Sequence, residues 1–255
     1  QSRSNEPTKR DVHEALIVSH EKAGNHAVAR RLHKEYLTAL SQIQRRSARA
    51  QLDTIKRSFK LPARAMEPGS SVLPPNVLEK LRNRDREVWQ SFRAKLEAMA
   101  VLAELRDDST GEHAFRVGRL SAIFAQAIGY NDVQVQTIEL AARLHDIGKL
   151  VVPDLVLQKR GKLVEAELEV MRCHTTEGAA QLMEVQHEAF KPAAEIALCH
   201  HEWWDGNGYP QQLRGEGIPE PARITALVDV FDALPHKRPY KPALPFDRCV
   251  ESIRD

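Results

Sequence analysis

Apolar residues recur every three to four positions along most of the chain, the spacing that places them on one face of an α-helix. From Asp11 to about Lys60 there is a single glycine, Gly24, and no proline, which predicts helices over residues 11–22 and 26–59. A long helix is expected from about Asn76 to Arg106, followed by medium helices joined by short loops. No sustained alternation of apolar and polar residues occurs apart from residues 150–152, so the predicted fold class is all-α.

Prolines and glycines divide the chain into four predicted parts. Residues 1–60 form a helical hairpin with an extension that resembles the last hairpin of a tetratricopeptide array, although a helical hairpin of any kind fits as well. Residues 61–77 are expected to be a linker, residues 78–106 a long connecting helix, and residues 107–255 a helical-bundle domain. The apolar positions of the long helix fit packing along that domain or a parallel homodimer. These positions are Leu78, Leu81, Val88, Phe92, Leu96, Met99, Leu102 and Leu105.

Within the domain, apolar residues at helical spacing predict four faces that point to a core. The faces are Val117, Leu120, Ile123, Phe124 and Ala127; Ile138, Ala141, Ala142 and His145; Ile196, Ala197 and His200; and Ile224, Leu227 and Phe231.

The composition narrows the class of protein. Hydrophobic residues make up 42% and charged residues 28% of the chain, which is typical of a globular protein, and the formal charge of +2 argues against nucleic acid as a partner. No apolar run approaches 18 residues, so no membrane span is expected. The three cysteines form no CxxC motif, which favours a reducing compartment and a cytoplasmic location. Because the first residue is Gln1 and not Met, the chain is expected to be part of a longer protein.

The histidines fall into two sets. Those expected to be solvated are His13, His20, His26, His33, His187 and His236. The others flank or interrupt apolar helix faces: His113 opens a helix, His174 closes one, and His145-Asp146 and His200-His201 stand as pairs. Asp229 lies inside the apolar stretch ITALVDVFDAL, where an unpaired carboxylate would be costly. A metal centre would satisfy these groups together, and imidazole and carboxylate ligands suit Mn, Fe, Ni or Zn.

Three motifs in this order resemble a known family. LHDIGKL at 144–150 resembles the signature of HD-domain phosphohydrolases. HHEWWDGNGYP at 200–210, followed by ARITALVDVFDAL and by RPYK at 238–241, resembles the HD-GYP subfamily, the cyclic di-GMP phosphodiesterases of bacterial signalling. The resemblance covers about residues 100–254.

The resemblance implies a centre of two divalent ions, Fe or Mn, with Ni and Zn as alternatives. The first ion would be held by His113, His145, Asp146 and Asp229, and Asp146 would bridge to a second ion held by His174, His200 and His201. A hydroxide shared by the two ions would open the phosphodiester, with Asp146 and Lys149 as the catalytic residues. The residues implied to contact the substrate are Lys149, Gly208, Tyr209, Pro210, Arg238 and Lys241.

The chain departs from the family pattern in three places. Ser109 stands where members with three metals have a glutamate, which predicts a binuclear site and linear pGpG as the product. Pro235-His236 replaces a common Thr-Ser pair, so Pro235 should end its helix early and shift Arg238. The domain is also expected to be shortened at its C-terminus.

Several alternatives remain open at the level of sequence. The domain could be a weak or inactive module that binds nucleotide or a partner, or it could hydrolyse another cyclic dinucleotide. A protein partner could bind through the N-terminal helices or the GYP loop.

Overall fold

The computed structural model describes residues 9–58, 75–106, 111–184, 190–235 and 244–254. Within these ranges all regular structure is helical, which confirms the predicted all-α class. The elements are α1 (Lys9–Lys22), α2 (His26–Ser58), α3 (Pro75–Glu104), α4 (His113–Ala127), α5 (Asp132–Arg143), η1 (Ile147–Val151), α6 (Asp154–Leu157), α7 (Glu165–Met183), α8 (Lys191–Cys199), η3 (Gly215–Gly217), α9 (Glu220–Ala233) and α10 (Phe246–Arg254).

The helix boundaries follow local signals in the sequence. α1 and α2 match the two helices predicted over 11–22 and 26–59, and Gly24 between them has a φ of +75°. α5 begins at an Asn131 cap, whose side chain accepts a hydrogen bond from the Gln134 backbone N–H at 3.0 Å. α9 ends at Ala233, just before Pro235, as predicted. The short apolar stretch 150–152 is not a strand, because it continues the 3₁₀ turn η1.

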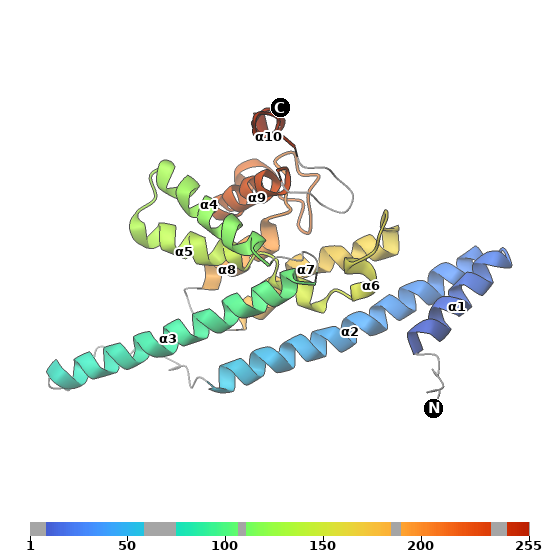
Figure 1. The fold of residues 1–255 in the computed structure, drawn as a ribbon, viewed down its shortest axis with the longest axis horizontal. Coiled ribbons are helices and arrows are strands. Elements are labelled where there is room, and N and C mark those ends of the chain that lie inside the picture. Colours follow the sequence, from blue (N-terminus) through green and yellow to red (C-terminus); the bar gives the residue numbers. More distant parts are fainter. Residues whose placement is uncertain (1–8, 59–74, 107–110, 185–189, 236–243, 255) are drawn as a thin grey trace.

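Figure 1 shows α2 and α3 as two long helices that extend beyond a cluster formed by the shorter helices. The C-terminal part of α3 belongs to the main core, where Leu96 and Met99 pack against Leu144 and Ile147 and against apolar residues of α8. This part of α3 therefore packs within its own chain. The side chains of residues 75–86, 88, 89 and 92, which include the N-terminal half of the predicted apolar seam, lie outside the described residues.

Helix α2 is docked on the same cluster, against η1, α6 and α7. Leu37 is fully buried in a second core with Val152, Val156 and Leu157. Ion pairs join α2 to α7 on either side of this core. They are His33–Glu167 at 3.0 Å, Lys34–Glu169 at 2.7 Å and Arg45–Glu177 at 3.0 Å. His33, expected to be solvated, is instead held by a buried carboxylate that the sequence pattern of α2 alone does not indicate.

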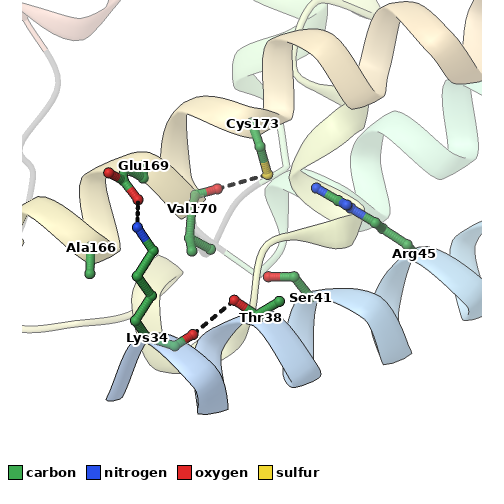
Figure 2. Close-up of a pocket in the computed structure, with 8 residues that line it drawn as sticks. All are labelled: Lys34, Thr38, Ser41, Arg45, Ala166, Glu169, Val170 and Cys173. Carbon is green, nitrogen blue, oxygen red and sulfur yellow. Dashed lines mark hydrogen bonds and ion pairs between the residues drawn. The ribbon is translucent and has the colours of Figure 1, made fainter. Parts of the chain in front are cut away.

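A small cavity of about 140 Å³ lies between α2 and α7 (Figure 2). Figure 2 shows Lys34 reaching across to Glu169, and the Cys173 thiol hydrogen-bonded to the Val170 carbonyl oxygen at 2.9 Å. Cys173 and Cys199 are free thiols. Ser41 also lines the cavity, and its buried hydroxyl has no hydrogen-bond partner among the described residues.

The predicted helix faces are wrong in two places. In α4 the buried face consists of Val117, Gly118, Ser121, Ala122 and Ala125, whereas Ile123 and Phe124 are 52% and 38% exposed. In and after α3, Leu102 and Leu105 are exposed, and Ala103 and Glu104 are buried in their place. In α4 small residues face the core because α5 approaches closely: a Cβ on Gly118 would lie 2.7 Å from the Glu139 carbonyl oxygen, which periodicity alone does not reveal.

His174 does not close a helix but lies in the middle of α7. The residues after it are poor helix formers, yet Thr175 and Thr176 donate their hydroxyls to the backbone carbonyls of Arg172 and Cys173, both at 3.0 Å. Two residues further on, Gly178 packs closely on Gly148 of η1. Across the described ranges, no helix combines the length and apolar character needed to cross a lipid bilayer.

Candidate metal centre

The residues predicted to bind metal come from five separate segments. His113 is the first residue of α4, His145 and Asp146 lie between α5 and η1, His174 is in α7, His200 and His201 follow α8, and Asp229 is in α9. All but His201 and Asp229 are buried. Helix packing therefore gathers side chains that are far apart in the sequence.

Their candidate ligand atoms form two groups, each with atoms within 4.8 Å of one another. The groups are His113 with His145 and Asp146, and His174 with His200 and His201. Asp146 faces both: its Oδ2 is 3.1 Å from Nε2 of His145, and its Oδ1 is 3.4 Å from Nε2 of His174 and 3.7 Å from Nε2 of His200. This is the arrangement that a bridging carboxylate requires.

Asp229 extends the first group. Its Oδ1 lies 3.1 Å from Nε2 of His113. Burial would raise the pKa of Asp229, but contacts with His113 and His145 hold it well below its usual range. The carboxylate that interrupts the apolar face of α9 is thus paired with the first histidine.

Three of the histidines are oriented by backbone carbonyls of their own helices. The contacts are His145 Nδ1 to Ala142 O at 2.8 Å, His174 Nδ1 to Met171 O at 2.7 Å, and His200 Nδ1 to Ile196 O at 3.0 Å. Because a carbonyl oxygen only accepts, each Nδ1 donates, and Nε2 is the nitrogen left to face the centre. This is the usual way in which a protein fixes the tautomer of a metal-binding histidine.

Two atoms in the middle of the site test whether a metal fits. Nε2 of His145 and Oδ1 of Asp146 are buried, and neither makes a hydrogen bond within the described residues. An unsatisfied buried polar atom costs about 1–3 kcal/mol. A cation between them would satisfy both atoms at once, so the residues present fit a divalent metal ion.

His113 is held from its other side by a second carboxylate. Its Nδ1 is 2.8 Å from Oδ2 of Asp232, and Arg116 donates two hydrogen bonds to the same carboxylate at 2.8 and 2.9 Å. Burial alone would lower the pKa of His113, but Asp229 and Asp232 raise it to about 10. Burial likewise opposes the ionisation of Asp232, whereas His113 and Arg116 bring its pKa to about 2. Asp232 therefore holds the outer nitrogen of His113, a predicted ligand, and does not face the centre.

The second group is electrostatically different. Burial lowers the pKa of His174 to about 4, and the neighbouring His200 and Lys149 act in the same direction. Burial, together with His200 and His174, lowers the pKa of His201 to about 2. Both rings are neutral near pH 7, which is the state in which imidazole binds metal.

Lys149 lies one turn after Asp146 in η1. The Nζ of Lys149 is 2.9 Å from Oδ2 of Asp146. Burial alone would raise the pKa of Asp146, but the positive charges of Lys149 and His145 hold it well below its usual range. Gly148, between them, packs directly on α7: a Cβ at this position would lie 2.6 Å from the Gly178 N and still closer to the His174 carbonyl oxygen. Only glycine lets η1 approach α7 this closely.

The GYP loop closes beside the second group. A Cβ on Gly208 would lie 2.5 Å from Cα of Glu202. The buried Glu202 carboxylate accepts hydrogen bonds from the backbone N–H groups of Gln211 at 2.6 Å and Leu213 at 2.9 Å. These contacts hold Tyr209 against His201, with Pro210 following it.

Some of the residues for which the sequence makes a prediction lie outside the described residues. They are Arg238 and Lys241, predicted to contact substrate phosphates, together with Ser109, His187 and His236.

Sequence reasoning missed residues that support the site. Arg116 and Glu202 follow the predicted ligands His113 and His201 within one turn, and that proximity was the signal. Glu104 is the other case: it is 3% exposed, neither carboxylate oxygen has a hydrogen bond within the described residues, and burial raises its pKa. Nothing in its local sequence marks it as buried.

Comparison with known proteins agrees with this geometry. Residues 97–255 match the family model described as "HD domain". The chain is 44% identical over 158 residues to a protein of Thermotoga maritima named cyclic di-GMP phosphodiesterase, covering 62% of this chain and 43% of that protein. It is also 44% identical over 164 residues to the cyclic di-GMP phosphodiesterase response regulator RpfG of Xanthomonas campestris, covering 64% and 43%.

A third relative carries a different name. The 3'3'-cGAMP-specific phosphodiesterase 2 of Vibrio cholerae is 39% identical over 166 residues, covering 65% of this chain and 30% of that protein. The chain spans less than half the length of each of these relatives. The family model, however, matches more than half of the chain, and the HDIGK and HHEWWDGNGYP motifs each contribute two residues to one of the two groups. The chain therefore belongs to the HD domain family, and within it to the HD-GYP group.

Proposed function

We propose that this chain is a metal-dependent phosphodiesterase that hydrolyses cyclic di-GMP to linear pGpG. The observation that carries the proposal is Asp146, a single carboxylate that faces both groups of histidines. Two relatives of 44% identity that are named cyclic di-GMP phosphodiesterases support the substrate.

The metal centre would hold two divalent ions. The imidazole and carboxylate donors suit Mn, Fe, Ni or Zn, and the resemblance to the HD-GYP family favours Fe or Mn. His113, His145, Asp146 and Asp229 would hold one ion, and Asp146, His174, His200 and His201 the other. When bound, two such ions lower the pKa of a shared water and neutralise charge on the phosphate. Ser109 in place of a glutamate supports two ions and an arrest at pGpG.

The protein's own groups would position the substrate. Lys149 lies 2.9 Å from Asp146 and is 17% exposed, so its ammonium can turn from that carboxylate to a phosphate oxygen at the mouth of the site. Asp146 stays ionised at neutral pH, because its pKa is low. Gly208, Tyr209 and Pro210 would line the substrate side, and Arg238 and Lys241 would bind the phosphates.

Two further parts of the proposal concern the roles of the separate segments of the chain. Residues 107–255 would be the catalytic domain, with residues 1–60, the linker 61–77 and the helix 78–106 as a regulatory or partner-binding part. The ion pairs between α2 and α7 support this coupling, because α7 carries His174. A homodimer through α3 is the alternative use of that helix.

The second candidate substrate is 3'3'-cyclic GMP-AMP, favoured by the Vibrio cholerae relative. The deciding experiment compares hydrolysis of both dinucleotides by the Mn-loaded chain, with products separated by chromatography. We expect pGpG to accumulate, and Asp146→Asn to lower the rate more than about 100-fold. The exposed Asp132 provides a matched control, since Asp132→Asn should leave the rate unchanged.

Two results would contradict the proposal. A chain that binds metal but turns over neither dinucleotide would support a nucleotide- or partner-binding module. Direct conversion to GMP, or a third bound ion, would contradict the binuclear assignment.

A further inference from the structure

His201 differs from the other histidines of the second group in how its ring is held. The rings of His174 and His200 donate hydrogen bonds to helix carbonyls. No residue in the described part of the chain hydrogen-bonds to the His201 ring. This ring instead stacks on Tyr209, with 4.8 Å between ring centroids and 24° between planes, and it also contacts the tilted ring of His200 at 4.2 Å and the His174 ring edge-on at 5.1 Å. An imidazole without a hydrogen-bond partner is free to rotate about its side-chain bonds unless something packs on its face.

Tyr209 is itself fixed by contacts on several sides. Its backbone N–H donates to the His201 carbonyl at 3.1 Å, so loop and ligand are tied together at the backbone. The Glu202 carboxylate holds the loop segment after Tyr209 in place, because it accepts hydrogen bonds from the backbone N–H groups of Gln211 and Leu213. The backbone of the GYP loop is therefore tied to the His201 backbone by contacts within the protein itself.

The guanidinium of Arg172 completes this arrangement. Its Cζ lies 5.3 Å from the centroid of the Tyr209 ring, within the range of a cation–π contact. Arg172 precedes His174 by two residues in α7, so the same helix supplies one ligand directly and steadies another through Tyr209. Arg172, Tyr209 and His201 form a continuous series of contacts that joins α7 to the segment after α8.

We propose that Tyr209 and Arg172 are positioning residues for the metal ligand His201, with the Tyr209 ring taking the place of the hydrogen bond that orients the other histidines. The inference rests on the proposed metal centre and extends it, because it assigns the GYP tyrosine to the protein's own ligand shell. The aromatic face of residue 209, and not its hydroxyl, is what the role requires.

The test measures metal binding alone, with Mn²⁺ as the probe and no nucleotide. Metal-free wild-type chain, Tyr209→Phe, Tyr209→Leu and Arg172→Met are titrated with Mn²⁺, and free ion is followed by electron paramagnetic resonance. Loss of a residue that orients a ligand typically costs 10–100-fold in metal affinity. We expect Tyr209→Leu to weaken the second ion by about 10–100-fold, Arg172→Met by a smaller factor of about 3–10, and Tyr209→Phe by less than about 2-fold.

Matched controls separate this role from general damage. Arg119 is an exposed arginine of α4, and Arg119→Met should bind both ions as the wild type does. Rescue by phenylalanine distinguishes ring stacking from a role of the hydroxyl. Should Tyr209→Leu fail to fold by circular dichroism, Arg172→Met and Tyr209→Phe still decide the question.

Other outcomes overturn the inference in distinguishable ways. Unchanged Mn²⁺ affinity in Tyr209→Leu and Arg172→Met, with only the KM for cyclic di-GMP raised, would assign Tyr209 to substrate alone. A wild-type chain that binds no divalent ion would overturn the metal centre and this inference together. A wild-type chain that binds two ions but hydrolyses nothing would contradict the proposed reaction, and the Mn²⁺ affinities of the variants would still decide the role of Tyr209.

Discussion

The carboxylate of Asp232 lies 2.8 Å from Nδ1 of His113, while Nε2 of the same ring faces Asp229 at 3.1 Å. His113 and Asp232 are 119 positions apart in the sequence and meet because α4 packs against α9. Arg116 donates two hydrogen bonds to the carboxylate of Asp232. The ring of His113 is thereby locked with one nitrogen toward the centre and one toward a buried carboxylate.

We expect Asp232→Asn to weaken metal binding without removing a ligand. The asparagine has no charge to hold the His113 ring or to bind Arg116, and such losses typically reduce metal affinity 10–100-fold. Titration with Mn²⁺ measures the effect, with Asp132→Asn as an exposed control. Equal affinity in Asp232→Asn and wild type would show that Asp232 is not needed to orient His113.

The metal-free protein should lose stability as the pH rises above neutrality. The pKa of His113 is raised from 6.5 to about 10 in the folded chain, so its stabilising contribution is fully present below pH 6.5 and is lost as the pH rises through about 10. Chemical unfolding of chelator-treated protein from pH 6.5 to 10 measures this loss. The Asp232→Asn variant, with less charge beside the ring, should lose this contribution at a lower pH.

A flat profile over that range would contradict the paired, protonated state of His113. At acidic pH the dependence of stability on pH has the opposite sign. The pKa of Asp232 is lowered from 3.8 to about 2, so its contribution is present above pH 3.8 and disappears as the pH falls through about 2.

Gly148→Ala should disturb both histidine groups at once. The new Cβ would press on the backbone of α7 at Gly178 and His174, and forced overpacking of this kind costs about 1–3 kcal/mol. We therefore expect a lower free energy of unfolding together with reduced metal content by elemental analysis. A Cβ on Gly217 would meet no heavy atom within 4 Å, so Gly217→Ala should stay within about 0.5 kcal/mol of wild type. Full metal content and stability in Gly148→Ala would contradict the close packing of η1 on α7.

Leu37→Ala should destabilise the chain even though Leu37 lies far from the metal ligands in sequence. Leu37 is fully buried against Val152, Val156 and Leu157, and truncation of such a leucine costs about 2–5 kcal/mol. Ile43 in the same helix is 62% exposed, so Ile43→Ala should change the urea midpoint little. If Leu37→Ala and Ile43→Ala have the same urea midpoint, α2 is not a fixed part of the core. That result would also contradict the proposed coupling of α2 to α7.

Local features of the sequence predicted most of the helices and pointed to a metal centre. Uninterrupted helical periodicity predicted α1, α2 and α3 close to their observed bounds, and Pro235 marked the end of α9. Histidines and carboxylates on apolar helix faces indicated a metal centre, because buried polar groups need partners. Both predictions depend on short-range information: propensity, spacing and residue type.

Which side of each helix is covered, and which groups meet, follows from tertiary packing alone. Periodicity placed Ile123 and Phe124 of α4 toward the core, but close packing of α4 on α5 selected the small residues Gly118 and Ala122. His33 and Glu167, and likewise Tyr209 and His201, pair because separate segments dock at a fixed distance and angle. Such contacts depend on long-range packing, and a linear pattern of residue types carries no record of it.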